Sequence, residues 1–502
     1  MGAAFTRTQG WAFLAILLVA AGLRAWAALT TGPVHPDELF QYLEPAHRNV
    51  FGYGVVTWEY RYGMRSWLLP LLLSVPMQLG AWVAPDGGLY LALPRLTAAA
   101  LSLLAVVGAY GLGARLSRFH GLVAMAVAAT WYDIAYFGGH VLTESLSTAL
   151  ILPTAGILLA EAPRRRGLVL AGLLFGLAGI LRFHYLPAIA VLAVLSCGLD
   201  WRGRWAPLVL GGVAAAAIGA AVDLAMGQVP FGWIAVNFTQ NIVADRAAGF
   251  GVHPPLTYLV WLVQLWGFAL GFILLLVLPV LRPYRPLIWA AAANLVLHSL
   301  IGHKEYRFIF LTVAILVVVA AIGSAEFLRR MKPRLPGRAA PLAAAALLSA
   351  WFGTSAALAA GRGLESGWRG FLAGSEAALA LRAEPRLCGV GVLSMLPLHV
   401  GGSTILHRRV PFYVDGPPFG SAGDIPLALS SRAFNGAIVP EDKIAQLPAG
   451  YRRIACSAPE TGVDPAYPER PVRVCALLRE GGCDSAAGAS QELQAVMKRR
   501  DS

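Results

Sequence analysis

The sequence has few charged residues for its length. Only 13% of its 502 residues are Asp, Glu, Lys or Arg, whereas 57% are hydrophobic. Its mean hydropathy is +0.62. Because about 25% of the residues of a typical soluble domain are charged, this composition excludes a soluble globule. It predicts a polytopic α-helical membrane protein.

Cysteine is also scarce, with five residues, and none has the spacing of a metal site. The sequence also lacks a glycine-rich phosphate loop after a strand and a repeat of fixed period. We therefore expect no metal, no cofactor and no soluble nucleotide-dependent chemistry. Four cysteines gather near the carboxy terminus, where an oxidising compartment would allow two disulfides in any of three pairings. They are Cys388, Cys456, Cys475 and Cys483.

Long apolar runs are abundant. A membrane span needs roughly 20 mostly apolar residues, and about eleven runs approach this length. The expected spans are 11–30, 94–113, 120–138, 145–161, 167–182, 183–199, 205–225, 257–281, 286–302, 307–325 and 339–360.

The net charge of +13 comes mainly from short loops between these runs. A basic chain can bind nucleic acid, but Lys and Arg in short loops are typical of the cytoplasmic side of a membrane protein. We therefore expect no nucleic-acid partner. With a cytoplasmic amino terminus, the first long loop (31–93) and the carboxy-terminal tail fall outside the cytoplasm.

The chain is expected to have two domains. Residues 1–361 form a transmembrane domain, and residues 362–502 form a small extracytoplasmic α+β domain with short β-like runs at 388–393 and 409–414. A further apolar stretch, 67–84, would invert every later loop if it crossed the membrane. We therefore interpret it as an interfacial or re-entrant helix.

The segment His35–Ser66 carries four carboxylates directly after the first apolar run, and charge at that depth is usually functional. Pro36 is suited to the first position of a helix, which places Asp37 and Glu38 in the first turn, where the helix dipole favours negative charge. Asp37, Gln41 and Glu44 then recur on one face, with Glu38 about 100° away. A polar helix start at an interface is the alternative interpretation.

A second polar cluster lies at residues 303–307, with the sequence HKEYR, between two apolar runs. Its cationic side chains suit a phosphate, although a snorkelling hairpin would have similar residues. Other polar and aromatic groups expected on the same side are weak signals individually. They include His140, Glu144, Arg182, His184, Asn237, Asn241, Trp58, Tyr60 and Trp233.

Three motifs together resemble glycosyltransferase family 22. They are HPDE at 35–38, FGYGVVTWEY with a following RS within 51–66, and HKEYRF at 303–308. A weaker pattern of Asp223, Gly227, Asn237 and Asn241 also fits, and the resemblance covers about residues 11–325. It implies the GT-C glycosyltransferase fold and an α-mannosyltransferase.

The resemblance further implies a polyprenyl- or dolichyl-phosphate-linked mannose (or other hexose) donor, a glycan or glycolipid acceptor, inversion at the anomeric carbon and no required metal. Asp37 is then the catalytic base, with Glu38 beside it. The donor phosphate would bind His303, Lys304, Arg307 and Arg182. The predicted substrate-binding residues are His35, Gln41, Glu44, Trp58, Glu59, Arg65, Asn237, Asn241 and Glu305.

The richness in Ala, Arg and Gly indicates a bacterial inner-membrane protein with a periplasmic site, or an endoplasmic reticulum protein if the source is eukaryotic. A flippase of polyprenyl-linked sugars is an alternative, but a transporter should show paired internal repeats and charges at the membrane midplane. Within enzymes, the alternatives are GT-C transferases of another sugar, such as aminoarabinose, or onto protein.

Overall fold

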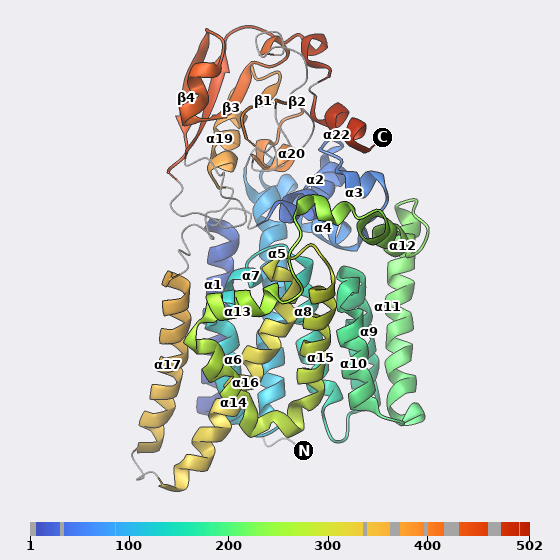
Figure 1. The fold of residues 1–502 in the computed structure, drawn as a ribbon, viewed down its shortest axis with the longest axis vertical. Coiled ribbons are helices and arrows are strands. Elements are labelled where there is room, and N and C mark those ends of the chain that lie inside the picture. Colours follow the sequence, from blue (N-terminus) through green and yellow to red (C-terminus); the bar gives the residue numbers. More distant parts are fainter. Residues whose placement is uncertain are drawn as a thin grey trace. The chain divides into compact units, whose positions relative to one another are not determined.

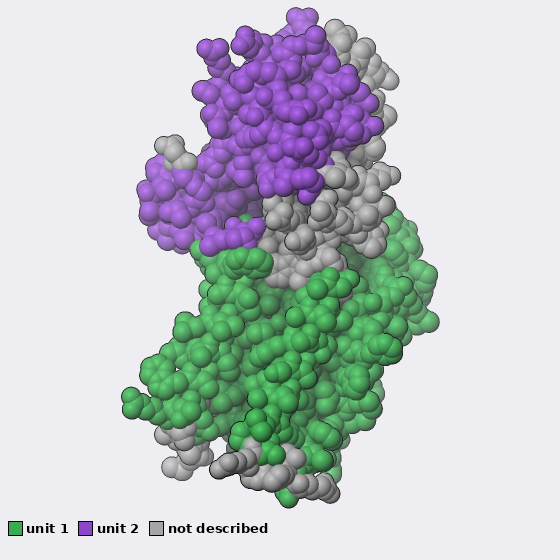
Figure 2. All heavy atoms as spheres, turned by 90° about the vertical axis from the view of Figure 1, so that its left-hand side faces the viewer, with its two compact units in different colours: residues 1–28, 66–68, 95–362 green, residues 29–65, 69–94, 363–502 purple. Residues whose placement is uncertain are grey.

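The computed structural model describes residues 7–30, 35–85, 87–334, 339–361, 372–395, 400–415, 431–459, 473–490 and 492–501. The chain divides into two compact units, coloured separately in Figure 2. Unit 1 contains residues 1–28, 66–68 and 95–362, and unit 2 contains residues 29–65, 69–94 and 363–502. The first long loop therefore packs with the carboxy-terminal tail in unit 2.

Unit 1 consists mainly of helices (Figure 1). They are α1 (Arg7–Thr30), α5 (Leu89–Ala114), α6 (Arg118–Thr130), α7 (Tyr132–Gly138), α8 (Thr143–Leu158), α9 (Arg165–Leu181), α10 (Leu186–Cys197), α11 (Ala206–Ala225), α12 (Gly232–Phe238), α13 (Thr257–Trp266), α14 (Phe268–Val277), α15 (Leu281–Leu300), α16 (Phe310–Met331) and α17 (Ala339–Gly361). Helices α1 and α5 each extend into unit 2 at one end.

Six helical stretches among the described residues are long and apolar enough to cross a membrane, and a seventh is added if the bent pair α6 and α7 counts as one. They are Arg7–Thr30, Leu89–Ala114, Trp201–Ala225, Phe268–Leu300, Tyr306–Met331 and Ala339–Gly361. The chain is therefore an integral membrane protein, as predicted. Each of the eleven expected runs overlaps a helix, but several of these helices are short, so the number eleven stays a prediction.

The apolar stretch 67–84 forms helix α4 (Leu68–Val83), which has 16 residues and Pro76 in its interior. At 1.5 Å per residue this helix is about 24 Å long, which is shorter than the hydrocarbon core of about 30 Å. Because α8 has the same length and overlaps an expected span, the interfacial or re-entrant position of α4 stays a prediction.

Helix α16 forms the core of unit 1. It is buried along almost its entire length, and it packs against α6, α8, α14 and α15. A helix that is apolar all round is suited to such a central place. Close backbone approach supports a second pair, α9 with α11. A Cβ atom on Gly172 would lie 1.8 Å from the Leu208 carbonyl oxygen, so this crossing requires glycine.

Arg24 of α1 is 1% exposed and holds the junction between α6 and α7, where the chain bends by 63°. The last carbonyl groups of a helix have no partner within it, and arginine can satisfy them. The guanidinium donates to four carbonyl oxygens and one hydroxyl, those of Ala20, Ala128, Ala129, Ile134 and Ser102. This buried cation is therefore enclosed by neutral acceptors.

Unit 2 contains a five-stranded sheet in the order β2-β1-β3-β5-β4 (Figure 1). Strand β1 is parallel to β2 and β3, whereas β5 is antiparallel to β3 and β4. This sheet confirms the small α+β domain expected in the tail. The strands are β1 (Val390–Val392), β2 (Phe412–Val414), β3 (Gly436–Pro440), β4 (Tyr451–Cys456) and β5 (Val474–Arg479), and the helices are α19 (Leu372–Arg382), α20 (Gly402–Leu406) and α22 (Leu493–Asp501).

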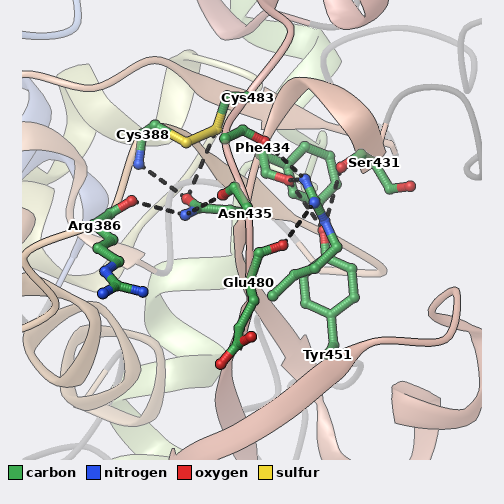
Figure 3. The surroundings of a disulfide bond; sticks show 11 residues. Arg386, Cys388, Ser431, Phe434, Asn435, Tyr451, Glu480 and Cys483 are labelled. Carbon is green, nitrogen blue, oxygen red and sulfur yellow. Dashed lines mark hydrogen bonds between the residues drawn. A yellow bond between two sulfur atoms is a disulfide. The ribbon is translucent and has the colours of Figure 1, made fainter.

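Two disulfides join Cys388 to Cys483 and Cys456 to Cys475. The sequence alone had left the pairing of these four cysteines open. The first lies beside Asn435, whose side chain accepts from the Cys388 amide at 2.9 Å and donates to the Arg386 carbonyl at 2.8 Å (Figure 3). The second joins directly paired residues of β4 and β5. The first disulfide therefore joins the segment before β1 to the segment after β5, and the second joins the edge strand β4 to β5.

The first long loop is also helical in unit 2. A π-helix (Glu38–Leu43) continues into α2 (Glu44–Phe51), which ends at Gly52 with φ of 78°. A short helix, α3 (Trp58–Arg61), follows before α4. The helix start predicted near Pro36 is therefore present, although its first part is wound more loosely than an α-helix.

Two histidines join α2 to the end of α20. His47 Nε2 lies 2.9 Å from His407 Nδ1, and His47 Nδ1 lies 3.1 Å from the Tyr53 carbonyl oxygen. Burial lowers the pKa of His47 to about 4, and the nearby Arg382 charge acts in the same direction. Burial, His47 and Arg382 also lower the pKa of His407 to about 4.

These histidines predict a stability that depends on pH. Below their usual pKa of 6.5 they gain protons when unfolded, but in the folded unit they stay neutral until about pH 4. The folded state therefore loses stability as the pH falls across this window. We expect the unfolding temperature of the purified protein to fall more steeply between pH 6.5 and 4 for wild type than for His47→Asn/His407→Asn. Equal slopes would contradict this assignment.

Candidate active site

The HPDE segment in unit 2 presents one carboxylate to the surface and encloses the other. The Asp37 side chain is 22% exposed, whereas Glu38 is fully buried. The Asp37 amide donates to His35 Nδ1 at 3.2 Å, and this nitrogen lies 3.6 Å from Asp37 Oδ1. His35 thus fixes the start of the helix, and Asp37 is the more accessible acid of the pair.

Two further predicted residues, Glu59 and Arg65, interact electrostatically with Asp37, and a third, Gln41, contacts Glu59. Gln41 Nε2 donates to Glu59 Oε1 at 3.0 Å. Burial raises the pKa of Glu59, the Arg65 charge opposes this shift, and the Asp37 charge adds to it. Burial alone would lower the pKa of Arg65, but Tyr42, Glu59 and Asp37 outweigh it and raise the pKa. Glu59 therefore contacts Gln41 directly and interacts electrostatically with Asp37 and Arg65.

Trp58, a predicted substrate-binding residue, begins α3 next to Glu59. Its ring centroid lies 6.3 Å from that of Tyr62 in an edge-to-face arrangement. The neighbouring Tyr60 donates from its hydroxyl to the Gln41 carbonyl oxygen at 2.6 Å. This bond ties α3 to the π-helix that follows Asp37.

Glu44 differs from the expectation of a substrate contact. It is fully buried, and its carboxylate accepts hydrogen bonds from the amides of Val55, Ser403 and Thr404 and from the Thr404 hydroxyl. The expected polar face assumed 3.6 residues per turn. Because the intervening turn is a π-helix with i to i+5 hydrogen bonds, residues seven apart no longer share that register. The contacts give Glu44 a structural position within unit 2.

The HKEYRF segment in unit 1 belongs to a buried charge network. Glu144, in the first turn of α8, places Oε1 3.2 Å from Arg182 at the end of α9 and 3.2 Å from Arg307. Arg307 Nε also donates to Glu305 Oε2 at 2.6 Å, and Glu305 Oε1 lies 3.0 Å from His303 Nε2. Five polar side chains thus form one continuous chain of contacts.

The network joins three basic side chains, Arg182, Arg307 and His303, to two carboxylates, Glu144 and Glu305. Arg182 and Arg307 are 7% and 5% exposed, and their guanidinium carbons lie 4.8 Å and 5.2 Å from the centre of the Phe308 ring. Burial alone would lower the pKa of His303, but the hydrogen bond and charge of Glu305 outweigh it and raise the pKa. Such a cluster can hold an anion.

Lys304 points toward the end of α15. Its ammonium donates to the Ser299 carbonyl at 3.0 Å and to the Ile301 carbonyl, and it lies 5.7 Å from the centre of the Tyr258 ring. A lysine at this place satisfies helix-terminal carbonyls. Of the predicted phosphate ligands, Arg182 and Arg307 therefore share the Glu144 carboxylate, whereas Lys304 contacts helix-terminal carbonyl groups.

The Asp223 to Asn241 pattern forms a local framework around the turn into α12. Asp223 Oδ2 accepts from the Phe231 amide at 2.8 Å and from Trp233 Nε1 at 3.2 Å. Asn241 Nδ2 donates to Asn237 Oδ1 at 3.1 Å, and Asn237 is 2% exposed. These bonds keep the turn closed.

Sequence reasoning did not place Glu144 among the site residues, although it noted the position. An acid in a helical first turn is common, so nothing local distinguished it. Its two arginine partners lie 38 and 163 residues further along the chain, and only the fold brings them to one carboxylate oxygen.

Solved structures with a similar fold define the class of protein. ArnT from Cupriavidus metallidurans in the apo state matches with a TM-score of 0.59 at 13% identity, covering 96% of this chain and 99% of ArnT. The Archaeoglobus fulgidus oligosaccharyltransferase matches with a TM-score of 0.52 at 13% identity, covering 86% and 70%. The chain has the GT-C fold of membrane glycosyltransferases, as predicted.

The chain belongs to the Alg9-like mannosyltransferase family, whose sequence profile matches residues 12–362. A relative from Yarrowia lipolytica, GPI mannosyltransferase 3, is 28% identical over 81% of this chain and 78% of its own. The human GPI alpha-1,2-mannosyltransferase 3 is 27% identical over 55% of this chain, and the match spans about half of the human protein, 51%.

Family membership confirms the predicted glycosyltransferase, and it favours the enzyme over the transporter. The family and the fold together support mannosyl transfer from a lipid-linked donor. The tail beyond residue 362 lies outside the matched profile.

Removing the charge of Glu144, which Arg182 and Arg307 share, should lower the stability of the protein. Glu144→Gln keeps the shape but leaves two buried arginines with less compensation, so we expect a loss of about 1–3 kcal/mol of unfolding free energy. The matched control is Glu441→Gln, because Glu441 is 36% exposed and also contacts two arginines, Arg453 and Arg473, which are 55% and 41% exposed. Chemical unfolding in detergent should show the larger loss for Glu144→Gln. A loss no larger than that of the control would contradict the assignment.

Proposed function

We propose that the chain transfers a mannosyl or other hexosyl unit from a polyprenyl- or dolichyl-phosphate donor to a hydroxyl of a glycan or glycolipid, with inversion at the anomeric carbon. The observation that carries this proposal is the pair of buried guanidinium groups, Arg182 and Arg307, that share Glu144 in one network with Glu305 and His303. A crystal structure of ArnT, which shares the fold, contains undecaprenyl phosphate.

The cationic network would act on the leaving group. As the bond between the anomeric carbon and the phosphate oxygen breaks, its electron pair and the developing charge pass to the lipid phosphate. Arg182, Arg307 and protonated His303 stabilise this charge through charge-assisted hydrogen bonds, which are strengthened where water is excluded. Glu305 orients two of these groups, because it contacts both His303 and Arg307.

Asp37 would act on the nucleophile. The acceptor hydroxyl attacks the anomeric carbon in line, forms the new glycosidic bond and gives its proton to the Asp37 carboxylate. A single in-line displacement inverts the anomeric carbon. The partial exposure of Asp37 and the full burial of Glu38 favour Asp37 for this role.

We place the reaction on the extracytoplasmic side, which is the periplasm in a bacterium and the lumen of the endoplasmic reticulum in a eukaryote. The two disulfides of unit 2 support this placement, because disulfides persist in oxidising compartments. The first long loop, which contains Asp37, belongs to the same unit.

Asp37→Asn should lower transfer of labelled mannose from synthetic polyprenyl-phosphate mannose roughly 10²- to 10⁴-fold, because it removes the proton acceptor. Binding of the donor lipid should be nearly unchanged. Asp442→Asn is the control, since Asp442 is 71% exposed in the tail. A panel of lipid-linked and free glycan acceptors should be used, and near-normal turnover by Asp37→Asn would exclude this base.

Arg307→Ala should weaken binding of undecaprenyl phosphate about 10-fold or more, because it removes a buried charge-assisted contact to the phosphate. Native mass spectrometry of the detergent-solubilised protein can measure this affinity. Arg452→Ala, at a residue 60% exposed on β4, serves as the control. Unchanged affinity in folded Arg307→Ala protein would count against the phosphate site.

A further inference from the structure

The tail, which lies beyond the family profile, forms hydrogen bonds with the loop that contains Asp37. Within unit 2, the Glu44 carboxylate accepts from the Ser403 amide at 3.0 Å and from the Thr404 amide at 2.7 Å. The Thr404 hydroxyl donates to the same carboxylate, and the Val55 amide closes the set from the loop itself at 2.7 Å. A fully buried carboxylate needs such a complete set of donors.

The backbone around residue 402 is shaped for this carboxylate. Gly401 and Gly402 have φ values of +77° and +58°, which favour glycine. A Cβ atom on Gly402 would lie 3.1 Å from both oxygens of Glu44 and 3.0 Å from Phe40. The two glycines therefore turn successive amides toward Glu44 in the manner of an anion-binding nest.

A second contact holds the same helix three residues further on. His47 Nε2 lies 2.9 Å from His407 Nδ1, and the Tyr90 ring stacks on the His407 ring with centroids 4.0 Å apart. The Tyr90 hydroxyl donates to the Thr404 carbonyl oxygen at 2.6 Å. Residues 401–407 thus fix α2 at both Glu44 and His47.

Asp37 is on the same helical segment. The segment is helical from residue 36 to residue 51, and the π-helix Glu38–Leu43 directly connects Asp37 to Glu44. A rigid hold on Glu44 fixes the rotation and height of this helix, and hence the direction of the Asp37 side chain. Misplacing a catalytic group by about 1 Å can cost about 10²-fold in rate.

We infer that Glu44 and Thr404 are positioning residues for Asp37, so that the carboxy-terminal domain completes the catalytic loop. This inference rests on the proposed role of Asp37 as the base. It assigns to the tail a part in the rate of the reaction, in addition to stabilising unit 2.

The test uses Thr404→Val in the full-length protein, which removes one donor to Glu44 and keeps the side-chain volume. We expect kcat to fall about 10-fold or more while KM for the donor changes less than about 2-fold, because the base is displaced and the phosphate ligands are not. Thr404→Ser keeps the hydroxyl and should restore most of the turnover.

Ser457→Ala is the matched control for a loss of a tail hydrogen bond. Ser457 is 3% exposed, and its hydroxyl accepts from the Val474 amide at 3.1 Å. Both residues lie outside α2 and outside the segment 401–407. It should lower thermal stability without changing kcat per folded molecule. A drop in kcat equal to that of Thr404→Val would overturn the inference.

A double variant separates positioning from a purely structural effect. If Thr404 acts through Asp37, adding Thr404→Val to Asp37→Asn should cause little further loss of turnover. The inference would be overturned if the losses of the two variants were fully additive, or if folded Thr404→Val protein kept its kcat. In either case a drop in turnover for Asp37→Asn would still support the proposed function. Normal turnover by Asp37→Asn would instead remove the base on which both depend.

Discussion

An ionised side chain inside an apolar body must have partners, and this constraint organises the described parts of both units. Removing a charge from water costs several kcal/mol unless other groups replace its hydration. Arg24 is satisfied by carbonyl oxygens at a helix bend, Glu144 by two arginines, and Glu44 by amides and a hydroxyl. Each solution joins segments that are distant in the sequence.

These three ways of satisfying a buried charge have different functional consequences. The donors of Arg24 are all directed to neutral acceptors, so this residue fixes shape and offers nothing to a ligand. Glu144 instead shares one carboxylate between Arg182 and Arg307, and Glu305 contacts both Arg307 and His303, so three basic side chains share two carboxylates. Basic groups that share their counter-charges suit an anion site, and this sharing distinguishes the network from Arg24 and Glu44.

Much of the fold and part of the site could be predicted from the sequence. Apolar run length predicted the helices, and the ordered motifs around Asp37 and Arg307 indicated the family. The position of Glu44 could not be predicted, because helical periodicity assumes 3.6 residues per turn and the π-helix changes the register. The pairing of Glu144 with Arg307 was also beyond sequence reasoning, since no local pattern specifies contacts across more than 160 residues.

The separation between Glu44 and Thr404, 360 residues, has a consequence for biogenesis. A ribosome adds about 5–20 residues per second, so the tail follows the first loop by roughly 20–70 s. During that interval the Glu44 carboxylate has none of its donors from residues 403 and 404. The first loop is therefore among the earliest parts of the chain to be made and among the last to reach its final structure, and a chain cut short before residue 404 cannot complete it.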